Sequence, residues 1–236
     1  MLNYYDFISS TSSDKKKSDP LVCKLLYRPP SFLIGWVLYL FGFSANQTSF
    51  LATLVALFSL PFLASTLSSY FIIGVLMLFF VSILDCADGN IARASKTSSQ
   101  VGNFFDALTG YVVYAFVPLS LSMHVFISAE GVFSFIHFFG IIAGVIAAIT
   151  NILARLIYHN WINSYVSTSN LDHVKNKPNY FSRISGETGM TGIMFPFLLA
   201  SYLLDNMQIF LFFYGFLYLF SFIFVSLKYA SLGFRV

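Results

Sequence analysis

Two aspartates near the end of an apolar stretch, Asp85 and Asp88, are the residues of this sequence best suited to chemistry. On a helix that turns about 100° per residue, Asp88 lies about 60° from Asp85 on one side, and Gly89 lies about 40° from it on the other. Ala92 returns to the same side and Arg93 follows it, so these residues form one narrow face. A charge in an apolar span is costly, by roughly 2.5–3.5 kcal/mol, and such residues usually face a cavity and have a role.

A second stripe of the same kind follows, with Gly102, Asp106 and Gly110 at successive steps of four residues. Small residues beside a carboxylate leave room for a ligand to reach the backbone. Together with Asp85 and Asp88, Asp106 offers hard oxygen ligands, which suit Mg²⁺ or Mn²⁺ better than zinc. We expect these three aspartates to bind a metal, with space beside it for a flat base or a diphosphate.

A structural role for the acids is the alternative. Asp85 or Asp88 can be neutralised by Arg93 or Lys96, or can cap a helix. Three acids that alternate with glycines at helical spacing favour the metal site over such pairing.

The elements that must position these residues are membrane helices. Of the 236 residues, 57% are hydrophobic and 10% are charged, whereas a soluble domain carries about 25% charged residues. At about 20 residues for each span, the length allows about six spans. The fold class expected is an all-α integral membrane protein, a single domain over 1–236 with a tail and juxtamembrane segment at 1–49. The expected spans are Phe50–Leu67, Ser69–Leu84 continuing to Ala94, Phe104–Ile127, Val132–Ile157, Gly192–Leu204 and Ile209–Leu227.

Charge and cysteine content limit the partners and the topology. With six spans and an interfacial helix at Ser31–Phe43, which is too short to cross, all 13 basic residues fall on one side of the membrane. By the positive-inside bias this side is cytosolic, so both termini and the aspartates are expected there. Basic residues beside spans suit anionic headgroups, and nothing points to a nucleic-acid partner. The two cysteines, Cys23 and Cys86, indicate neither a disulfide framework nor a zinc cluster.

The acid-bearing segments resemble the signature of the CDP-alcohol phosphatidyltransferase family (class I), D-x2-D-G-x2-A-R-x8-G-x3-D-x3-D. At the last position this chain has Gly110 where the family has an aspartate. Upstream, Asn46 and Ser49 resemble part of the family's P-N-x-(aliphatic)-T element. The positions that match in order and spacing are Asp85, Asp88, Gly89, Ala92, Arg93, Gly102 and Asp106.

The resemblance implies six helices, a homodimer and a displacement at phosphorus, in which an acceptor hydroxyl attacks the β-phosphorus of a CDP-linked alcohol and CMP leaves. It also implies that Asp85, Asp88 and Asp106 hold Mg²⁺ or Mn²⁺ against the diphosphate. Metal charge and positioning are what phosphoryl transfer mostly needs. The substrate-binding residues that it implies are Asn46, Gly89, Ala92, Arg93 and Gly102.

Gly110 raises the question of the general base, because the family's fourth aspartate is expected to deprotonate the acceptor. Positioned acid-base help is typically worth about 10²- to 10⁴-fold in rate. A replacement can come from Glu187, or from His159 or the Asp172–His173 region in a polar loop expected at His159–Glu187. The alternative role for Glu187 is to complement the dipole of a helix N-terminus.

Two arginines are candidates to bind an acceptor phosphate, Arg155 on the fourth expected span and Arg183 in the loop. The alternatives are a side chain that snorkels to the headgroups and a solvated loop charge.

The function expected is therefore a metal-dependent membrane transferase that uses a CDP-alcohol such as CDP-diacylglycerol, with a lipid or polar alcohol as acceptor. One alternative is transfer of a small CDP- or CMP-linked head group to a lipid or glycan. Another is a non-catalytic relative that keeps the nucleotide and metal pocket, which Gly110 favours. An ion pathway is less favoured, since the acids gather near one membrane face.

Overall fold

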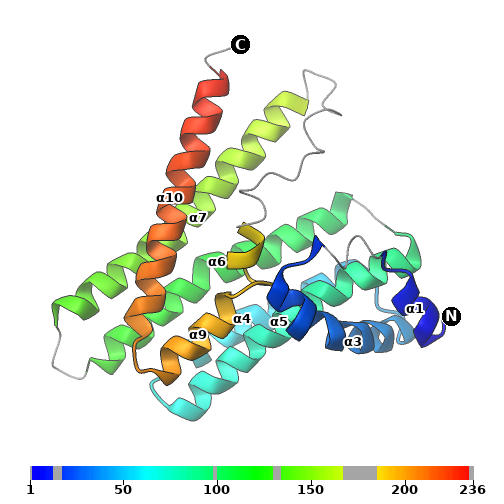
Figure 1. Cartoon of the computed structure of the whole chain (residues 1–236), viewed down its shortest axis with the longest axis horizontal. Helices are drawn as coiled ribbons and strands as arrows, with labels where there is room; N and C mark the ends of the chain where they lie inside the picture. The colour runs from blue at the N-terminus through cyan, green and yellow to red at the C-terminus, as the bar shows by residue number, and fades with distance from the viewer. Residues whose placement is uncertain (1, 13–17, 98–99, 130–133, 167–184, 234–236) are drawn as a thin grey trace. The chain divides into compact units, whose positions relative to one another are not determined.

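The computed structural model describes residues 2–12, 18–97, 100–129, 134–166 and 185–233. Over these residues the chain is helical and contains no strand, which confirms the all-α expectation (Figure 1). The elements in chain order are α1 (Tyr4–Ser9), η1 (Cys23–Tyr27), α3 (Arg28–Leu40), α4 (Ala45–Ala64), α5 (Ser68–Ser95), α6 (Gln100–Ser128), α7 (Phe135–Val166), α9 (Met194–Leu203) and α10 (Met207–Gly233).

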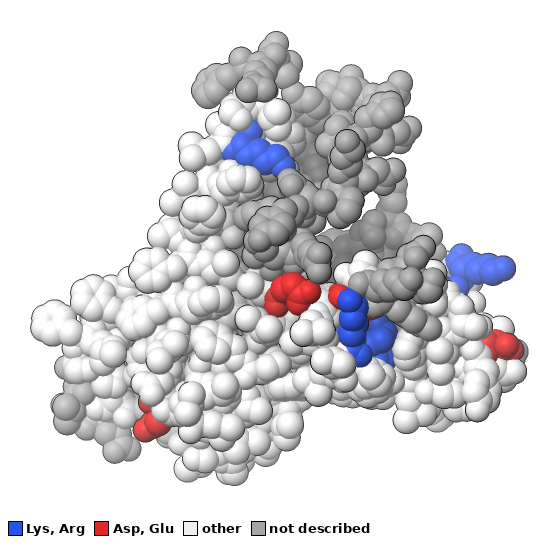
Figure 2. Space-filling view, in the orientation of Figure 1, with Lys and Arg blue, Asp and Glu red and all other residues white. Residues whose placement is uncertain are grey.

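Within the described ranges, five helices are long and apolar enough to cross a membrane, as an integral multi-pass membrane protein requires. They cover Ala45–Ala64, Ser68–Ser95, Ala107–Ser128, Phe135–Trp161 and Met207–Leu232. The face shown in Figure 2 carries few charged residues among those described. The fifth expected span corresponds to α9, whose 10 residues rise only about 15 Å, about half of a bilayer core. The count of six spans and the cytosolic position of the termini stay predictions.

The expected interfacial helix is α3, which begins at Arg28 rather than Ser31 and ends at Leu40 rather than Phe43. The early start is possible because Pro29 and Pro30 occupy the first turn of the helix, where backbone N–H groups have no acceptor within the helix and proline's lack of one costs nothing. Gly42 then adopts a left-handed φ of 79°, and Ser44 begins α4 as the N-cap of a capping box. With 13 residues, α3 is too short to span a bilayer.

The chain forms two compact units, Met1–Val113 with Phe181–Ala200, and Tyr114–Tyr180 with Ser201–Val236. In the first unit α4 packs along α5, and η1, α1 and α3 also contact α5. The approach of α4 to α5 is close at Gly74, where an added Cβ would lie 3.0 Å from the backbone nitrogen of Leu63. The interpretation of residues 1–236 as a single domain stays a prediction.

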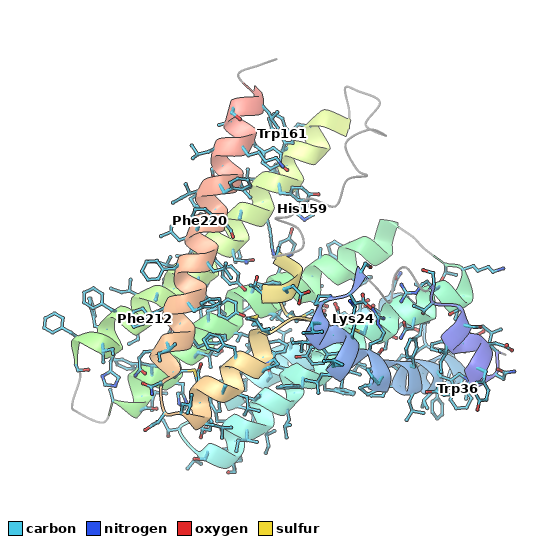
Figure 3. The ribbon with its side chains drawn as sticks, viewed as in Figure 1. Lys24, Trp36, His159, Trp161, Phe212 and Phe220 are labelled. Carbon is cyan, nitrogen blue, oxygen red and sulfur yellow. The ribbon has the colours of Figure 1, made fainter. Side chains whose placement is uncertain are left out.

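The second unit is built on α7 and α10, which lie side by side (Figure 1). Gly215 permits their contact, since a Cβ there would lie 2.8 Å from the carbonyl oxygen of Ala143. Phe220 projects from α10 and is 65% exposed, as expected of a side chain that faces lipid (Figure 3). Helix α7 continues to Val166, so His159 is helical rather than the start of a loop. The apolar pattern ends first, but residues 159–166 contain neither Gly nor Pro to stop the helix.

Candidate active site

A cavity of about 380 Å³ lies in the first unit, along the last turns of α5. The helix ends directly beyond it, because Lys96 adopts a left-handed φ of 53° and closes the helical hydrogen bonding. The cavity is lined from α5 by Asp85, Cys86, Asp88, Gly89, Ala92 and Arg93, which recur at helical spacing. Residues of α4, the start of α6 and the segment around Asp19 to Arg28 form the other walls.

Five of the seven residues expected to bind substrate line this cavity, namely Asn46, Gly89, Ala92, Arg93 and Gly102. They come from three helices, α4, α5 and α6. Gly89 leaves space for the side chain of Arg93. An added Cβ would lie 3.2 Å from Nη2 and 3.3 Å from Nη1 of Arg93, so glycine is what lets the arginine fold back along the helix.

Of the three aspartates expected to bind metal, Asp85 and Asp88 line the cavity. The hydroxyl of Ser49 on α4 donates to Oδ2 of Asp88 at 2.5 Å, which orients this carboxylate. Asp106 lies on α6, and its side chain is outside the described residues. Within the described part of the chain no group of three potential ligands is assembled, so the metal site stays a prediction.

Hydroxyl groups fix the start of α6 against α4. Thr109 and Thr53 share a hydrogen bond of 2.8 Å between their Oγ1 atoms. Thr109 also donates to the backbone oxygen of Ser49 at 3.2 Å. Gly110, the position where the family's last aspartate is missing, follows Thr109 directly and is buried. The helix that carries Asp106 is therefore tied to the residue that orients Asp88.

A buried ion pair closes the N-terminal side of the cavity. Nε of Arg28 donates to Oδ2 of Asp19 at 2.9 Å, and the two residues are 7% and 5% exposed. Burial acts to lower the pKa of Arg28, but the neighbouring Cys86 and Asp19 act to raise it, and the net pKa is above the ordinary arginine value. Arg28 is therefore a permanent cation, which the Asp19 carboxylate balances.

The two cysteines meet at the same wall. Cys23, at the start of the π-helical turn η1, and Cys86 on α5 are both buried, with their Sγ atoms 3.4 Å apart. Both line the cavity. Their contact joins the N-terminal segment to the helix that carries Asp85 and Asp88.

The candidate replacement base, Glu187, is held by the backbone. Its Oε2 accepts a hydrogen bond from the amide of Leu21 at 3.0 Å. Glu187 is not among the described residues that line the cavity, whereas Thr191, four positions further along the chain, is. Its role as a base stays a prediction.

Two of the remaining candidates, Arg155 and His159, are described, and neither is among the residues that line the cavity. Arg155 belongs to the second unit, where its Nε donates to Oδ1 of Asn151 at 2.9 Å and its guanidinium lies 4.4 Å from the ring centroid of Tyr114. His159 is exposed on α7. Arg183 and the Asp172–His173 region are outside the described residues.

Sequence reasoning did not assign four polar residues to the site, namely Asp19 and Arg28, which line the cavity, and Thr11 and Asn90 behind it. Asn90 is fully buried although it lies inside the acid-rich segment. The only sequence signal for Asn90 was its position, since it is a polar residue on the helix face opposite the stripe of acids. No pattern linked the N-terminal residues to α5, because their contacts span 58 to 82 positions of the sequence.

Two comparisons with known proteins bear on this site. The family model for CDP-alcohol phosphatidyltransferases matches residues 46–227, which is most of the chain and includes the cavity-lining residues of α5 and α6 and, from α4, Asn46 and Ser49. This match confirms the resemblance that the sequence shows. A comparison with curated protein sequences finds no match.

Proposed function

The chain belongs to the CDP-alcohol phosphatidyltransferase family, and from this premise we propose that it is a metal-dependent membrane transferase. It moves a phosphoalcohol group from a CDP-alcohol to an acceptor hydroxyl and releases CMP. The observation that carries the proposal is the cavity in which Asp85, Asp88, Gly89 and Arg93 lie together. Membership of the family implies a CDP-alcohol substrate and an alcohol acceptor, and members generally use a divalent metal.

The residues present fit a hard divalent cation. Asp85 and Asp88 supply oxygen ligands from adjacent turns of one helix, and the Ser49 hydroxyl leaves Asp88 further lone pairs for a cation. Asp106 is the third expected ligand. Mg²⁺ or Mn²⁺ at this place would neutralise charge on the diphosphate during transfer.

The chain's own residues would do the rest by binding and orienting. Arg93 contributes a positive charge to the diphosphate or the base, and Gly89 and Ala92 let the nucleotide approach the backbone of α5. Asn46, from the facing helix α4, completes the pocket. The acceptor oxygen would form a bond to the β-phosphorus as the bond to the CMP oxygen breaks. The acceptor's proton needs a base other than residue 110, and Glu187 stays the candidate.

A lipid-linked donor is supported by a second hollow. An apolar groove of about 590 Å³ is formed by residues of α4 and its preceding loop with Phe105 of α6. Asn46 lines both this groove and the polar cavity, so the two hollows are adjacent at that residue. A diacylglycerol chain would bury apolar surface in the groove while its CDP group occupies the cavity. CDP-diacylglycerol is therefore the first donor to test.

The membrane orientation and the assembly are part of the proposal. Arg93 and Lys96 end α5 beside the cavity, and basic residues at a helix end favour the cytosolic face. We place the active site there and expect a homodimer.

The test is CMP release by the purified protein in lipid nanodiscs. CDP-diacylglycerol and a panel of small CDP-alcohols are supplied with and without Mg²⁺ or Mn²⁺. Asp88→Asn and Asp106→Asn should reduce the metal-dependent turnover by at least about 10²-fold. The matched control is Asp205→Asn, since Asp205 lies in the other unit with a φ of 54°, which asparagine tolerates. Unchanged turnover in Asp88→Asn would refute the metal site. CMP binding without turnover of any donor would favour the non-catalytic alternative.

A further inference from the structure

A buried asparagine behind the cavity organises the polar side chains around it. Asn90 is 0% exposed, and both ends of its amide are hydrogen-bonded. We propose that Asn90 is a positioning residue, which holds Arg93 in the orientation that receives the nucleotide. This inference rests on the proposed function, because it concerns the same cavity.

The orientation of the Asn90 amide is determined by its partners. Nδ2 donates to Oγ of Ser31 at 3.1 Å, and the Ser31 hydroxyl donates onward to the backbone oxygen of Arg28 at 2.8 Å. Oδ1 therefore faces the arginines and accepts from Nη1 of Arg28 at 3.1 Å and from Nη2 of Arg93 at 2.9 Å. The reversed amide would place an N–H group against two guanidinium groups, which cannot accept a hydrogen bond.

Arg93 is held at two points. Besides the bond to Asn90, its Nε donates to Oγ1 of Thr11 at 3.3 Å, and the Thr11 hydroxyl lies 3.3 Å from Oδ1 of Asn90. These two bonds use two of the five guanidinium donors and lie on the side of α1 and α3. A long flexible side chain that is fixed before binding loses less entropy when a ligand arrives. The remaining donors can serve a phosphate or a cytosine in the cavity.

The charge balance behind Asn90 supports this role. Two arginines that share one neutral oxygen repel each other, and this would push Arg93 away. Asp19 forms a buried ion pair with Arg28, which offsets part of this repulsion while Arg28 donates to Asn90. Arg93 keeps its positive charge for an anionic ligand.

The experiment measures CMP affinity, by titration of the purified full chain, in a double-mutant cycle of Asn90→Leu and Arg93→Ala. Loss of a hydrogen bond to a charged group predicts that Asn90→Leu weakens CMP binding by about 10- to 100-fold in the wild-type background. In the Arg93→Ala background, the same change should weaken binding by less than about 2-fold, since its effect passes through Arg93. The control is Ser82→Ala, a buried hydroxyl on the same helix that donates to the backbone oxygen of Met190 outside the cavity.

Thr11→Val is the second variant, in case Asn90→Leu does not fold. It removes one bond to Arg93 at the margin of the cluster and should weaken CMP binding by about 3- to 10-fold. The inference is overturned if Asn90→Leu, or Thr11→Val in its place, binds CMP as the wild type does. It is also overturned if the loss is equal in both backgrounds, as a merely structural role would give. A wild-type chain that binds no CMP refutes the proposed function itself, and this inference with it.

Discussion

Replacing Gly89 by alanine separates the stability of α5 from the function of the cavity. In a helix interior, alanine is favoured over glycine by about 0.5–1 kcal/mol. The new Cβ would lie 3.2 Å from Nη2 and 3.3 Å from Nη1 of Arg93, which is too close without movement. Because these atoms are the far end of a flexible side chain, the guanidinium can shift by a few tenths of an ångström and the helix need not deform.

The expected result is therefore a loss of affinity without a loss of fold. The displaced guanidinium weakens its 2.9 Å bond to Asn90, which costs about 0.5–1.5 kcal/mol and offsets the gain in helix propensity. The free energy of unfolding should stay within about 1 kcal/mol of the wild type. CMP affinity should fall by at least about 10-fold, since the methyl group occupies the cavity and Arg93 is misplaced.

Gly74→Ala is the matched control on the same helix. It brings the same propensity gain, but its Cβ would lie 3.0 Å from the backbone nitrogen of Leu63 and from Cβ of Phe62, neither of which can easily move. Overpacking of this kind costs about 1–3 kcal/mol. This variant should lose stability, and its folded fraction should bind CMP normally. Unfolding in denaturant and CMP titration measure the two quantities. The reasoning is refuted if Gly89→Ala keeps full affinity, or if both variants lose stability equally.

Three further predictions address the walls of the cavity. Asp19→Ala leaves the buried Arg28 cation without its carboxylate and should lower the free energy of unfolding by about 3–5 kcal/mol; a change below about 1 kcal/mol in denaturant unfolding would contradict the buried pair. The Sγ atoms of Cys23 and Cys86 are 3.4 Å apart, so a mild disulfide oxidant should produce an intramolecular crosslink that mass spectrometry detects. The Cys23→Ser variant should not form this crosslink. Free thiols in the wild type after oxidation would contradict the contact. Glu187→Gln keeps an acceptor for the backbone amide of Leu21 and should preserve the melting temperature. A lower kcat in the CMP-release assay would then identify Glu187 as a base, and an unchanged kcat would exclude that role.

The sequence was sufficient for the class of fold and for the main face of the site. Apolar stretches of membrane length predict helices, because lipid offers no partners for an unpaired backbone. The acids at Asp85 and Asp88 with Gly89 and Arg93 share a face by helical geometry alone, and the family match confirms the resemblance built on them. All of these features depend on neighbours within one or two helical turns, and local spacing records them.

The boundaries of elements were less predictable. Helix α7 runs to Val166, beyond the apolar pattern that ends near Ile157, and α9 has only 10 residues where a full span was expected. Hydropathy reports where the lipid solvent ends, whereas a helix ends where its hydrogen bonding is interrupted.

Only the tertiary structure revealed the polar and cysteine contacts in and behind the walls of the cavity. The pairing of Asp19 with Arg28, the contact of Cys23 with Cys86 and the convergence of donors on Asn90 have no periodic signature in the sequence. These contacts join segments that are either irregular or far apart along the chain. Their existence depends on how α1, η1 and α3 pack against α5, and packing is decided by the shapes of many side chains together rather than by the spacing of a few.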